Sequence, residues 1–142
     1  MKRRQFIKSI VLFYSVLFIK PSSLLATINS VRLNKKAPEF LLKGYNKDNP
    51  KQSQWSLGDF SGKWLILYFY PKDFSSGCTL EAKGFQDILS KFKENNASIV
   101  GISADNEEEH ESFCTSSKLG FTLLSDVSGE ISRSYDSWLQ PY

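Results

Sequence analysis

The chain has 142 residues, of which 41% are apolar and 23% are charged, so its length and composition fit one globular domain. Five Lys or Arg residues and no acidic residue lie within the first 26 positions, which leaves the remainder with a charge of −2. That remainder lacks the basic character of a nucleic-acid-binding surface, and we expect no nucleic-acid partner. Two cysteines are too few for a disulfide scaffold but enough for one redox pair.

The first 26 residues have the pattern of an export signal. A basic head contains Lys2, Arg3 and Arg4, an uncharged run covers residues 9–19, and polar residues follow. That run of 11 residues is about half of the roughly 20 that a membrane-spanning helix needs. The sequence RRQFIK at residues 3–8 is similar to a twin-arginine signal. We expect residues 1–26 to be an export signal for the twin-arginine machinery, and residues 27–142 to form the exported domain.

Two other interpretations of this N-terminal segment stay open. Cleavage after Ala26 fits a signal, but Leu24 is bulkier than the small residue preferred three positions before a cut. The segment would otherwise remain as an uncleaved membrane anchor or pack as a buried amphipathic helix, although three adjacent basic residues argue against burial. Twin-arginine export would place a folded domain in the periplasm or the thylakoid lumen.

The remainder of the chain predicts strands that alternate with helices. Apolar, strand-forming runs lie at residues 37–42, 64–70, 98–104 and 121–126. Helical patterns begin near Cys78, after Asp105 or Asn106, and near Ser128. The run at 64–70 is continuously apolar, which predicts a central strand covered on both faces. Strands separated by such helices indicate an α/β layered domain with its sheet between helices.

Cys78 lies where a polar loop meets the first predicted helix. In the first turn of a helix, free backbone N–H groups and the helix dipole stabilise a thiolate, which is the nucleophilic form of cysteine. Gly77 lets backbone donors approach a small substrate, and the Ser75 hydroxyl can both donate and accept a hydrogen bond. We interpret Cys78 as a nucleophile, and the alternative is a small buried apolar residue.

The sequence YFYPKDFSSGCTLEAKGF, at residues 68–85, resembles the active-site segment of peroxiredoxins. It is most similar to the Q type, also called bacterioferritin comigratory proteins. The family pattern places a Thr or Ser four residues after a Pro and three residues before a Cys; here these are Pro71, Ser75 and Cys78. The motifs APEF, GKW, VGISAD and LGFTLLSD also resemble the family in the same order, so the similarity extends from about Ala37 to the end.

This resemblance implies a thioredoxin-like fold and a cofactor-free peroxidase that reduces hydrogen peroxide or organic hydroperoxides. Cys78 would be the peroxidatic cysteine, which attacks the peroxide and becomes a sulfenic acid. Ser75 would hydrogen-bond the peroxide, Pro71 would shield the pocket from water, and Glu81 would help to order the site. The subgroup is usually monomeric, so we expect a monomer.

The second cysteine is Cys114, 36 residues after Cys78. Some Q-type members have a second cysteine five residues after the first, where this chain has Lys83. The resemblance to other members implies that Cys114 resolves the sulfenic acid as an intramolecular disulfide, which a thioredoxin-like donor reduces. Joining the sulfurs at about 2 Å would require local unwinding. If Cys114 is instead a core residue beside Phe113, an external thiol would resolve Cys78.

His110 precedes Cys114 by four residues, a spacing that can bind metal with Cys78 as a third ligand. The chain has no C-x-x-C pair and no second histidine to support such a site. We therefore expect no metal, and we interpret His110 as a solvent-facing residue in an acidic helix.

The resemblance also implies that a C-terminal segment of the family's domain is missing from this sequence. The family arginine that stabilises the thiolate and the transition state follows the Tyr135–Trp138 region, whereas the sequence ends at Tyr142 and Arg133 does not match the motif. We expect a C-terminally incomplete domain with an exposed sheet edge, and loss of such charge stabilisation costs on the order of 10²-fold in rate. The alternatives are an inactive relative that acts as a binding module or a non-functional product. A thioredoxin-like disulfide exchanger is disfavoured because residues 75–78 lack a C-x-x-C pair.

Overall fold

The computed structural model describes residues 34–138, and the predictions for the N-terminal signal lie outside these residues. The described elements are β1 (Leu41–Tyr45), β2 (Gln54–Ser56), the 3-10 helix η1 (Leu57–Phe60), β3 (Trp64–Phe69), α1 (Ser76–Asp87), α2 (Leu89–Glu94), β4 (Ala97–Ser103), α3 (Glu107–Ser117), β5 (Thr122–Ser125) and α4 (Glu130–Ser134). Among residues 34–138, no helix has both the length and the apolar character needed to cross a membrane.

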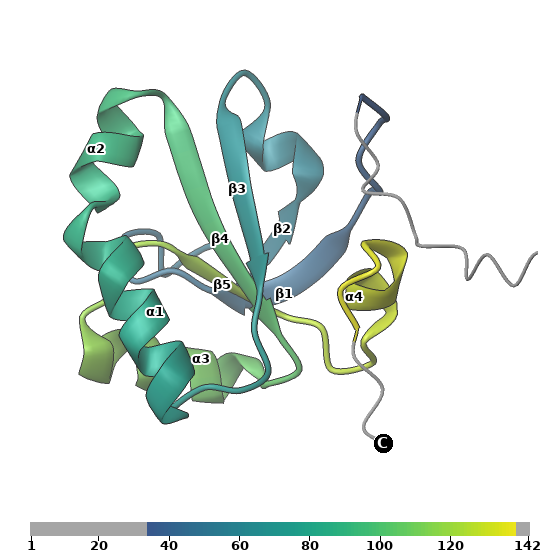
Figure 1. Ribbon diagram of the computed structural model, residues 1–142. Helices are drawn as coiled ribbons and strands as arrows, with labels where there is room; N and C mark the ends of the chain where they lie inside the picture. Colours follow the sequence, from purple (N-terminus) through teal and green to yellow (C-terminus); the bar gives the residue numbers. More distant parts are fainter. Residues whose placement is uncertain (1–33, 139–142) are drawn as a thin grey trace, which may run out of the picture. The chain divides into compact units, whose positions relative to one another are not determined.

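The five strands form one mixed sheet in the order β2-β1-β5-β4-β3 (Figure 1). β3, β4 and β5 are parallel, whereas β1 runs antiparallel to β5 and to β2. Because β3, β4 and β5 are parallel, their carboxyl ends lie at the same end of the sheet. The chain leaves β3 for α1 and β4 for α3 at that end, which brings the first turns of these two helices to one region.

The prediction that residues 64–70 form a central strand is wrong for the described part of the chain, where β3 lies at the edge of the sheet. A continuous apolar run reports that both faces of a strand are covered, but it carries no information on whether both edges are hydrogen-bonded. Both faces of β3 do pack on apolar neighbours: Ile66 and Tyr68 join one core, and Leu65 and Leu67 join the other.

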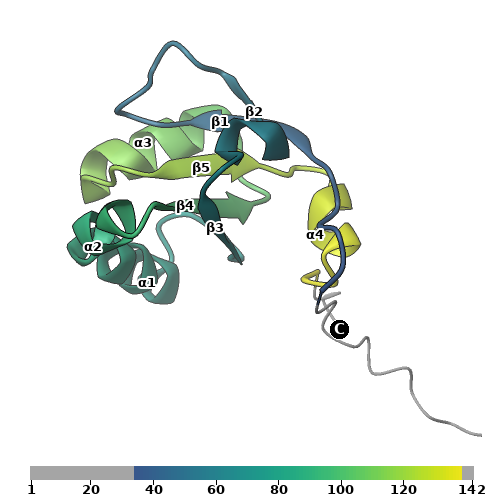
Figure 2. The ribbon, with the colours of Figure 1, turned by 90° about the horizontal axis from the view of Figure 1, so that it is seen from above.

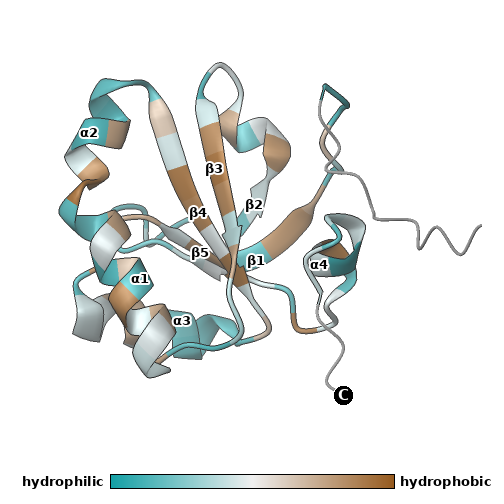
Figure 3. Cartoon of the chain, viewed as in Figure 1, coloured by the Kyte–Doolittle hydropathy of each residue, from teal (hydrophilic) through white to brown (hydrophobic). Residues whose placement is uncertain are grey.

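Two cores lie on opposite faces of the sheet. One face is covered by α1, α2 and α3, and the other by η1 and α4 (Figure 2). Adjacent strand residues alternate between the two cores, as Leu123 and Leu124 do in β5. Figure 3 shows the resulting distribution, with apolar residues along the strands and many polar residues on the helices. The predicted α/β layered architecture is therefore confirmed.

The helices follow the sequence pattern with two differences. The first predicted helix is interrupted at Ile88, so that α1 and α2 are separate, with Leu89 buried and Ile88 exposed. Apolar spacing continues across the interruption, which explains why the pattern did not reveal it. Asn106, and not Asp105, caps α3: its side chain accepts a hydrogen bond from Glu109 N–H while the Glu109 carboxylate accepts from Asn106 N–H.

Candidate active site

Cys78 is the third residue of α1, and the prediction that it lies at the start of a helix is confirmed. Ser75 is the N-cap, and its Oγ accepts a hydrogen bond from the Cys78 backbone N–H at 3.4 Å. Because Oγ accepts this bond, the Ser75 hydroxyl hydrogen is left to donate elsewhere. Cys78 is 8% exposed, so its sulfur belongs to the core under α1 while it lies next to a partly exposed loop.

Pro71 and Glu81 lie near Cys78 in the chain, and both are exposed. Pro71 follows the end of β3, at the beginning of the loop that leads to Ser75. Glu81 is one helical turn after Cys78 on α1, and among the described residues its side chain has no hydrogen bond or ion pair. The structure thus joins Ser75 directly to Cys78, whereas Pro71 and Glu81 are adjacent to the site without a polar contact to it.

Cys114 lies on α3 with a solvent exposure of 0%, in the same core cluster as Cys78. Both thiols are free. Burial, reinforced by the negative charge of Asp73, raises the pKa of Cys114 to about 12, and Lys47 opposes this only in part. Cys114 is therefore a protonated thiol at neutral pH as long as α3 stays packed.

His110 is fully buried, which contradicts the interpretation that it faces solvent. Its Nδ1 lies 2.7 Å from Asp73 Oδ2, and both side chains are almost completely inaccessible to solvent. The sequence did contain a signal for this burial, because His110, Phe113 and Cys114 have the spacing of one helix face. The acidic residues of α3 favoured a solvent-facing His110, but they occupy other faces of the helix.

Asp73 was not singled out by sequence, although it makes three polar contacts in the loop before Cys78. Its Oδ1 accepts a hydrogen bond of 2.7 Å from the Tyr70 hydroxyl, and its backbone N–H donates one of 2.8 Å to Asp105 Oδ2. Burial and the Asp73 charge both raise the pKa of Tyr70, which keeps this phenol a donor. Asp105 also accepts from the Ser103 hydroxyl, so the loop is tied to the end of β4.

Residues 33–142 match the family model described as the AhpC/TSA family. The chain belongs to the AhpC/TSA family. It is 38% identical over 109 residues to peroxiredoxin Bcp of Bacillus subtilis, covering 77% of this chain and 66% of that protein. It is also 45% identical over 80 residues to the chloroplastic peroxiredoxin Q of Sedum lineare, covering 56% and 43% of the two chains. The resemblance to Q-type peroxiredoxins is confirmed.

Solved structures agree with this membership. A Xanthomonas campestris peroxiredoxin Q is 34% identical, with a TM-score of 0.59 over 70% of this chain and 58% of that one. A Plasmodium vivax 2-Cys peroxiredoxin is 30% identical, with a TM-score of 0.69 over 75% and 69%. The expected thioredoxin-like fold is thereby confirmed. The chain spans about two thirds of the length of the first curated relatives that it matches.

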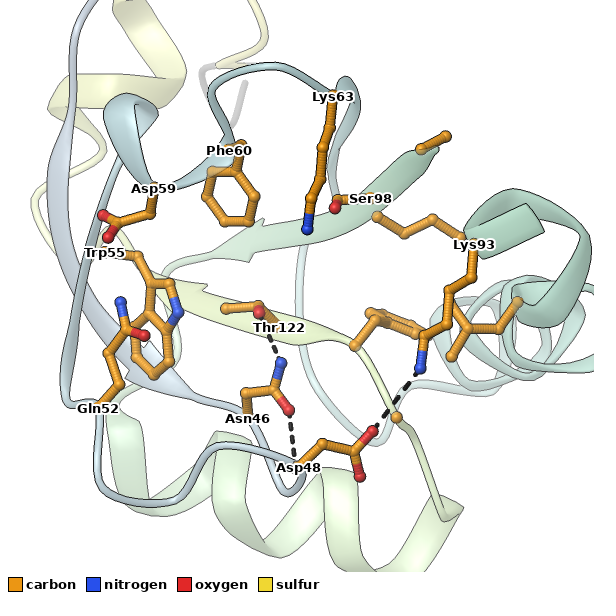
Figure 4. Close-up of a pocket in the computed structure, with 15 residues that line it drawn as sticks. Asn46, Asp48, Gln52, Trp55, Asp59, Phe60, Lys63, Lys93, Ser98 and Thr122 are labelled. Atoms are coloured by element: carbon orange, nitrogen blue, oxygen red, sulfur yellow. Dashed lines mark hydrogen bonds and ion pairs between the residues drawn. The ribbon is translucent and has the colours of Figure 1, made fainter. Parts of the chain in front are cut away.

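Within this AhpC/TSA domain, the residues that the structure describes contain no cluster of three or more His, Cys, Asp or Glu arranged to hold a metal ion. A cavity of about 280 Å³ lies at the other end of the sheet from Cys78, beside the starts of β4 and β5. Figure 4 shows its polar lining, in which Asp48 pairs with Lys93 at 3.8 Å and Asn46 donates to Thr122 at 2.8 Å. Neither cysteine lines this cavity, so the candidate active site remains the loop before α1.

Proposed function

We propose that this chain is a thiol-dependent peroxidase that reduces hydrogen peroxide or organic hydroperoxides through Cys78. The observation that carries the proposal is Cys78 in the first turn of α1, with the Ser75 N-cap bonded to its backbone, in a chain of the AhpC/TSA family. A solved structure of the Xanthomonas campestris bacterioferritin comigratory protein, 32% identical, concerns its alkyl peroxide reduction. That likeness supports an organic hydroperoxide as one substrate class.

The first step follows from the chemistry of a thiolate at a helix start. The Cys78 sulfur attacks the terminal oxygen of the peroxide, so that an S–O bond forms and the O–O bond breaks. The leaving oxygen takes the bonding pair and a proton, and it departs as water or an alcohol. Sulfur is oxidised by two electrons to the sulfenic acid. The free Ser75 hydroxyl hydrogen is placed to donate to the peroxide.

We propose Cys114 as the resolving cysteine. Its sulfur attacks the Cys78 sulfenic acid, an S–S bond forms, and the sulfenic oxygen leaves as water. A thioredoxin-like dithiol then reduces the disulfide and is itself oxidised to a disulfide. Two of the Xanthomonas campestris peroxiredoxin Q structures carry Cys-to-Ser changes 36 positions apart, the same separation as between Cys78 and Cys114. This equality supports the pairing, and we further propose that the active form is a monomer.

A peroxide-consumption assay with two cysteine variants tests these roles. Cys78→Ser is expected to lower the initial rate by about 10²-fold or more, because no other thiolate sits at a helix start. Cys114→Ser is expected to complete one turnover and then hold a sulfenic acid, seen by intact mass as one added oxygen. The peroxidase proposal fails if the unaltered chain consumes peroxide no faster than Cys78→Ser. A stable sulfenic acid in the unaltered chain, rather than a loss of two hydrogens, would instead remove Cys114 from the mechanism.

We also propose that residues 1–26 direct the domain to the periplasm or the thylakoid lumen through the twin-arginine machinery. The support is the order of basic head, short uncharged run and RRQFIK motif in the sequence. The alternative is that the same residues remain attached as a membrane anchor.

A further inference from the structure

We propose that Asp73 and His110 are positioning residues for the peroxide reaction: with Tyr70 they form a buried clasp that holds the Cys78 loop against α3 and must open before Cys114 reaches Cys78. This inference rests on the proposed peroxidase function. The clasp is defined by Tyr70, Asp73 and His110, none of which contacts solvent appreciably. It joins two segments that are 37 residues apart in the sequence.

The bonds of the clasp leave the Asp73 carboxylate held from two sides. Oδ2 lies 2.7 Å from His110 Nδ1, and Oδ1 accepts from the Tyr70 hydroxyl at 2.7 Å. The same hydroxyl lies 3.5 Å from His110 Nδ1, so the three groups form a closed set of contacts. Hydrogen bonds to a buried carboxylate are among the stronger ones in proteins, and breaking one leaves a costly unpaired group. The clasp therefore favours one position of the loop.

The loop before Cys78 contains a strained backbone conformation that the clasp can stabilise. Phe74, directly after Asp73, has a φ of +60°, which is unusual for a bulky side chain. Strain of this kind persists only where the surroundings fix the backbone, and it is concentrated at functional sites. Asp73 N–H is fixed on Asp105, and the exposed Phe74 ring packs edge-on against Phe113 with centroids 5.1 Å apart. Both contacts tie the strained loop to α3 or to the segment that enters it.

The clasp connects both cysteines to one set of bonds. Asp73 precedes the Ser75 cap by two residues, so its position sets the start of α1 and hence Cys78. His110 precedes Cys114 by one helical turn on the buried face of α3. Both thiols are free in this arrangement, and a disulfide requires their sulfurs to come within about 2 Å. Movement of α3 toward Cys78 must therefore strain or break the bonds at His110.

The proposal predicts opposite effects on two steps. With the clasp removed, the loop is less well placed and Cys78 reacts more slowly with peroxide, while α3 is released and the disulfide forms faster. A change that only lowers stability does not predict these opposite signs at temperatures well below unfolding. The variants are His110→Leu, which removes the bond, and His110→Asn, whose amide nitrogen takes the place of Nδ1. Tyr70→Phe is a milder variant, because it removes a single hydroxyl.

Two assays separate the steps. The first measures sulfenic acid formation with hydrogen peroxide in a Cys114→Ser background. The second measures Cys78–Cys114 disulfide formation with the azo oxidant diamide, which takes two electrons and two protons from the thiols to become a hydrazine. His110→Leu is expected to slow the first about tenfold and to speed the second about tenfold, with Tyr70→Phe changing both less. His110→Asn is expected to restore both rates to within about threefold of the unaltered chain.

The matched control is Leu124→Ala, which creates a large cavity in the core on the other face of the sheet. It is expected to lower the melting temperature and to leave both rates nearly unchanged. The clasp is refuted if His110→Leu leaves disulfide formation unchanged or slower, or if Leu124→Ala reproduces the opposite effects. If the unaltered chain does not react with peroxide, the proposed function fails. The rates of disulfide formation with diamide still test whether the clasp must open before Cys114 reaches Cys78.

Discussion

Three side chains near the candidate site, two buried and one partly buried, resist ionisation. Burial raises the pKa values of Tyr68, Tyr70 and Cys114, because the charged form of each loses its hydration. The negative charge of Asp73 adds to the effect in all three cases. Cys114 is thus a poor nucleophile while it stays buried, and exposing it would make a thiolate easier to form. A resolving role for Cys114 is therefore tied to movement of α3.

The stability of the domain is expected to fall at alkaline pH for the same reason. Burial raises the pKa of the Cys114 thiol from its ordinary value of 9.0 to about 12 in the folded chain. Between these values the unfolded chain has released the proton that the folded chain still holds, so the free energy of unfolding decreases as pH rises. The stabilising effect is fully present below pH 9 and is lost toward pH 12.

Urea unfolding at pH 7 to 11, with a thiol reductant present, measures this loss. Cys114→Ala is expected to lower the free energy of unfolding at pH 7, because it creates a cavity. Above pH 9, however, the free energy of unfolding of the variant is expected to decrease less with pH than that of the unaltered chain. Tyr70 contributes to both proteins above pH 10 and cancels in the comparison, whereas the replacement also removes the Cys114 charge that helps to raise the pKa of Tyr68. Parallel pH curves for the two proteins would show that burial does not shift the Cys114 titration.

Two glycines show how the elements limit substitution. Gly44 lies in β1 opposite Leu124 of β5, and a Cβ there would lie 2.1 Å from the carbonyl oxygen of Leu123. Backbone cannot yield as a flexible side chain can, so the two strands would have to separate. Gly84 lies in α1, where an added Cβ would meet no atom within 4 Å.

Gly44→Ala is expected to lower the free energy of unfolding by about 1–3 kcal/mol or more through overpacking. Gly84→Ala is expected to raise it by roughly 0.5–1 kcal/mol, because alanine loses less backbone entropy in a helix. Urea denaturation of each single variant and of the unaltered chain shows whether the free energy of unfolding rises or falls. A neutral Gly44→Ala would mean that β1 and β5 do not approach as closely as the structure places them.

At the scale of the whole molecule, the proposed peroxidase chemistry and the proposed export signal belong to separate parts of the chain. Both cysteines belong to the core between the sheet and the layer of α1, α2 and α3. The proposed export signal is outside the described residues, and the family match begins at residue 33. The export proposal can therefore be tested without the AhpC/TSA domain.

Residues 1–33 fused to a folded fluorescent protein are expected to bring fluorescence into the periplasm of a bacterium with a twin-arginine pathway. Replacing both Arg3 and Arg4 with Lys keeps the charge and is expected to abolish most of this export. Equal export of the double-lysine fusion would contradict twin-arginine recognition. The mass of the exported fusion then distinguishes cleavage near Ala26 from an uncleaved anchor.

Local features of the sequence determined much of the fold and part of the site. Apolar spacing predicted β3, β4, β5 and most helix starts, including the one near Cys78, whereas β2 was not predicted and β1 begins four residues after the start of the run at 37–42. The peroxiredoxin motif around Pro71, Ser75 and Cys78 was sufficient to indicate the family that the comparisons confirm. These signals are readable because each depends on residues only a few positions apart.

Only the tertiary structure decided which distant residues meet. It placed β3 at the edge of the described sheet, and it buried His110 against Asp73, from a separation of 37 positions. A histidine in an acidic helix carries no local mark of its partner, because the partner is supplied by a loop after another strand. The sequence determined a cysteine at a helix start, and the packing of α3 on the loop decided what holds that cysteine in place.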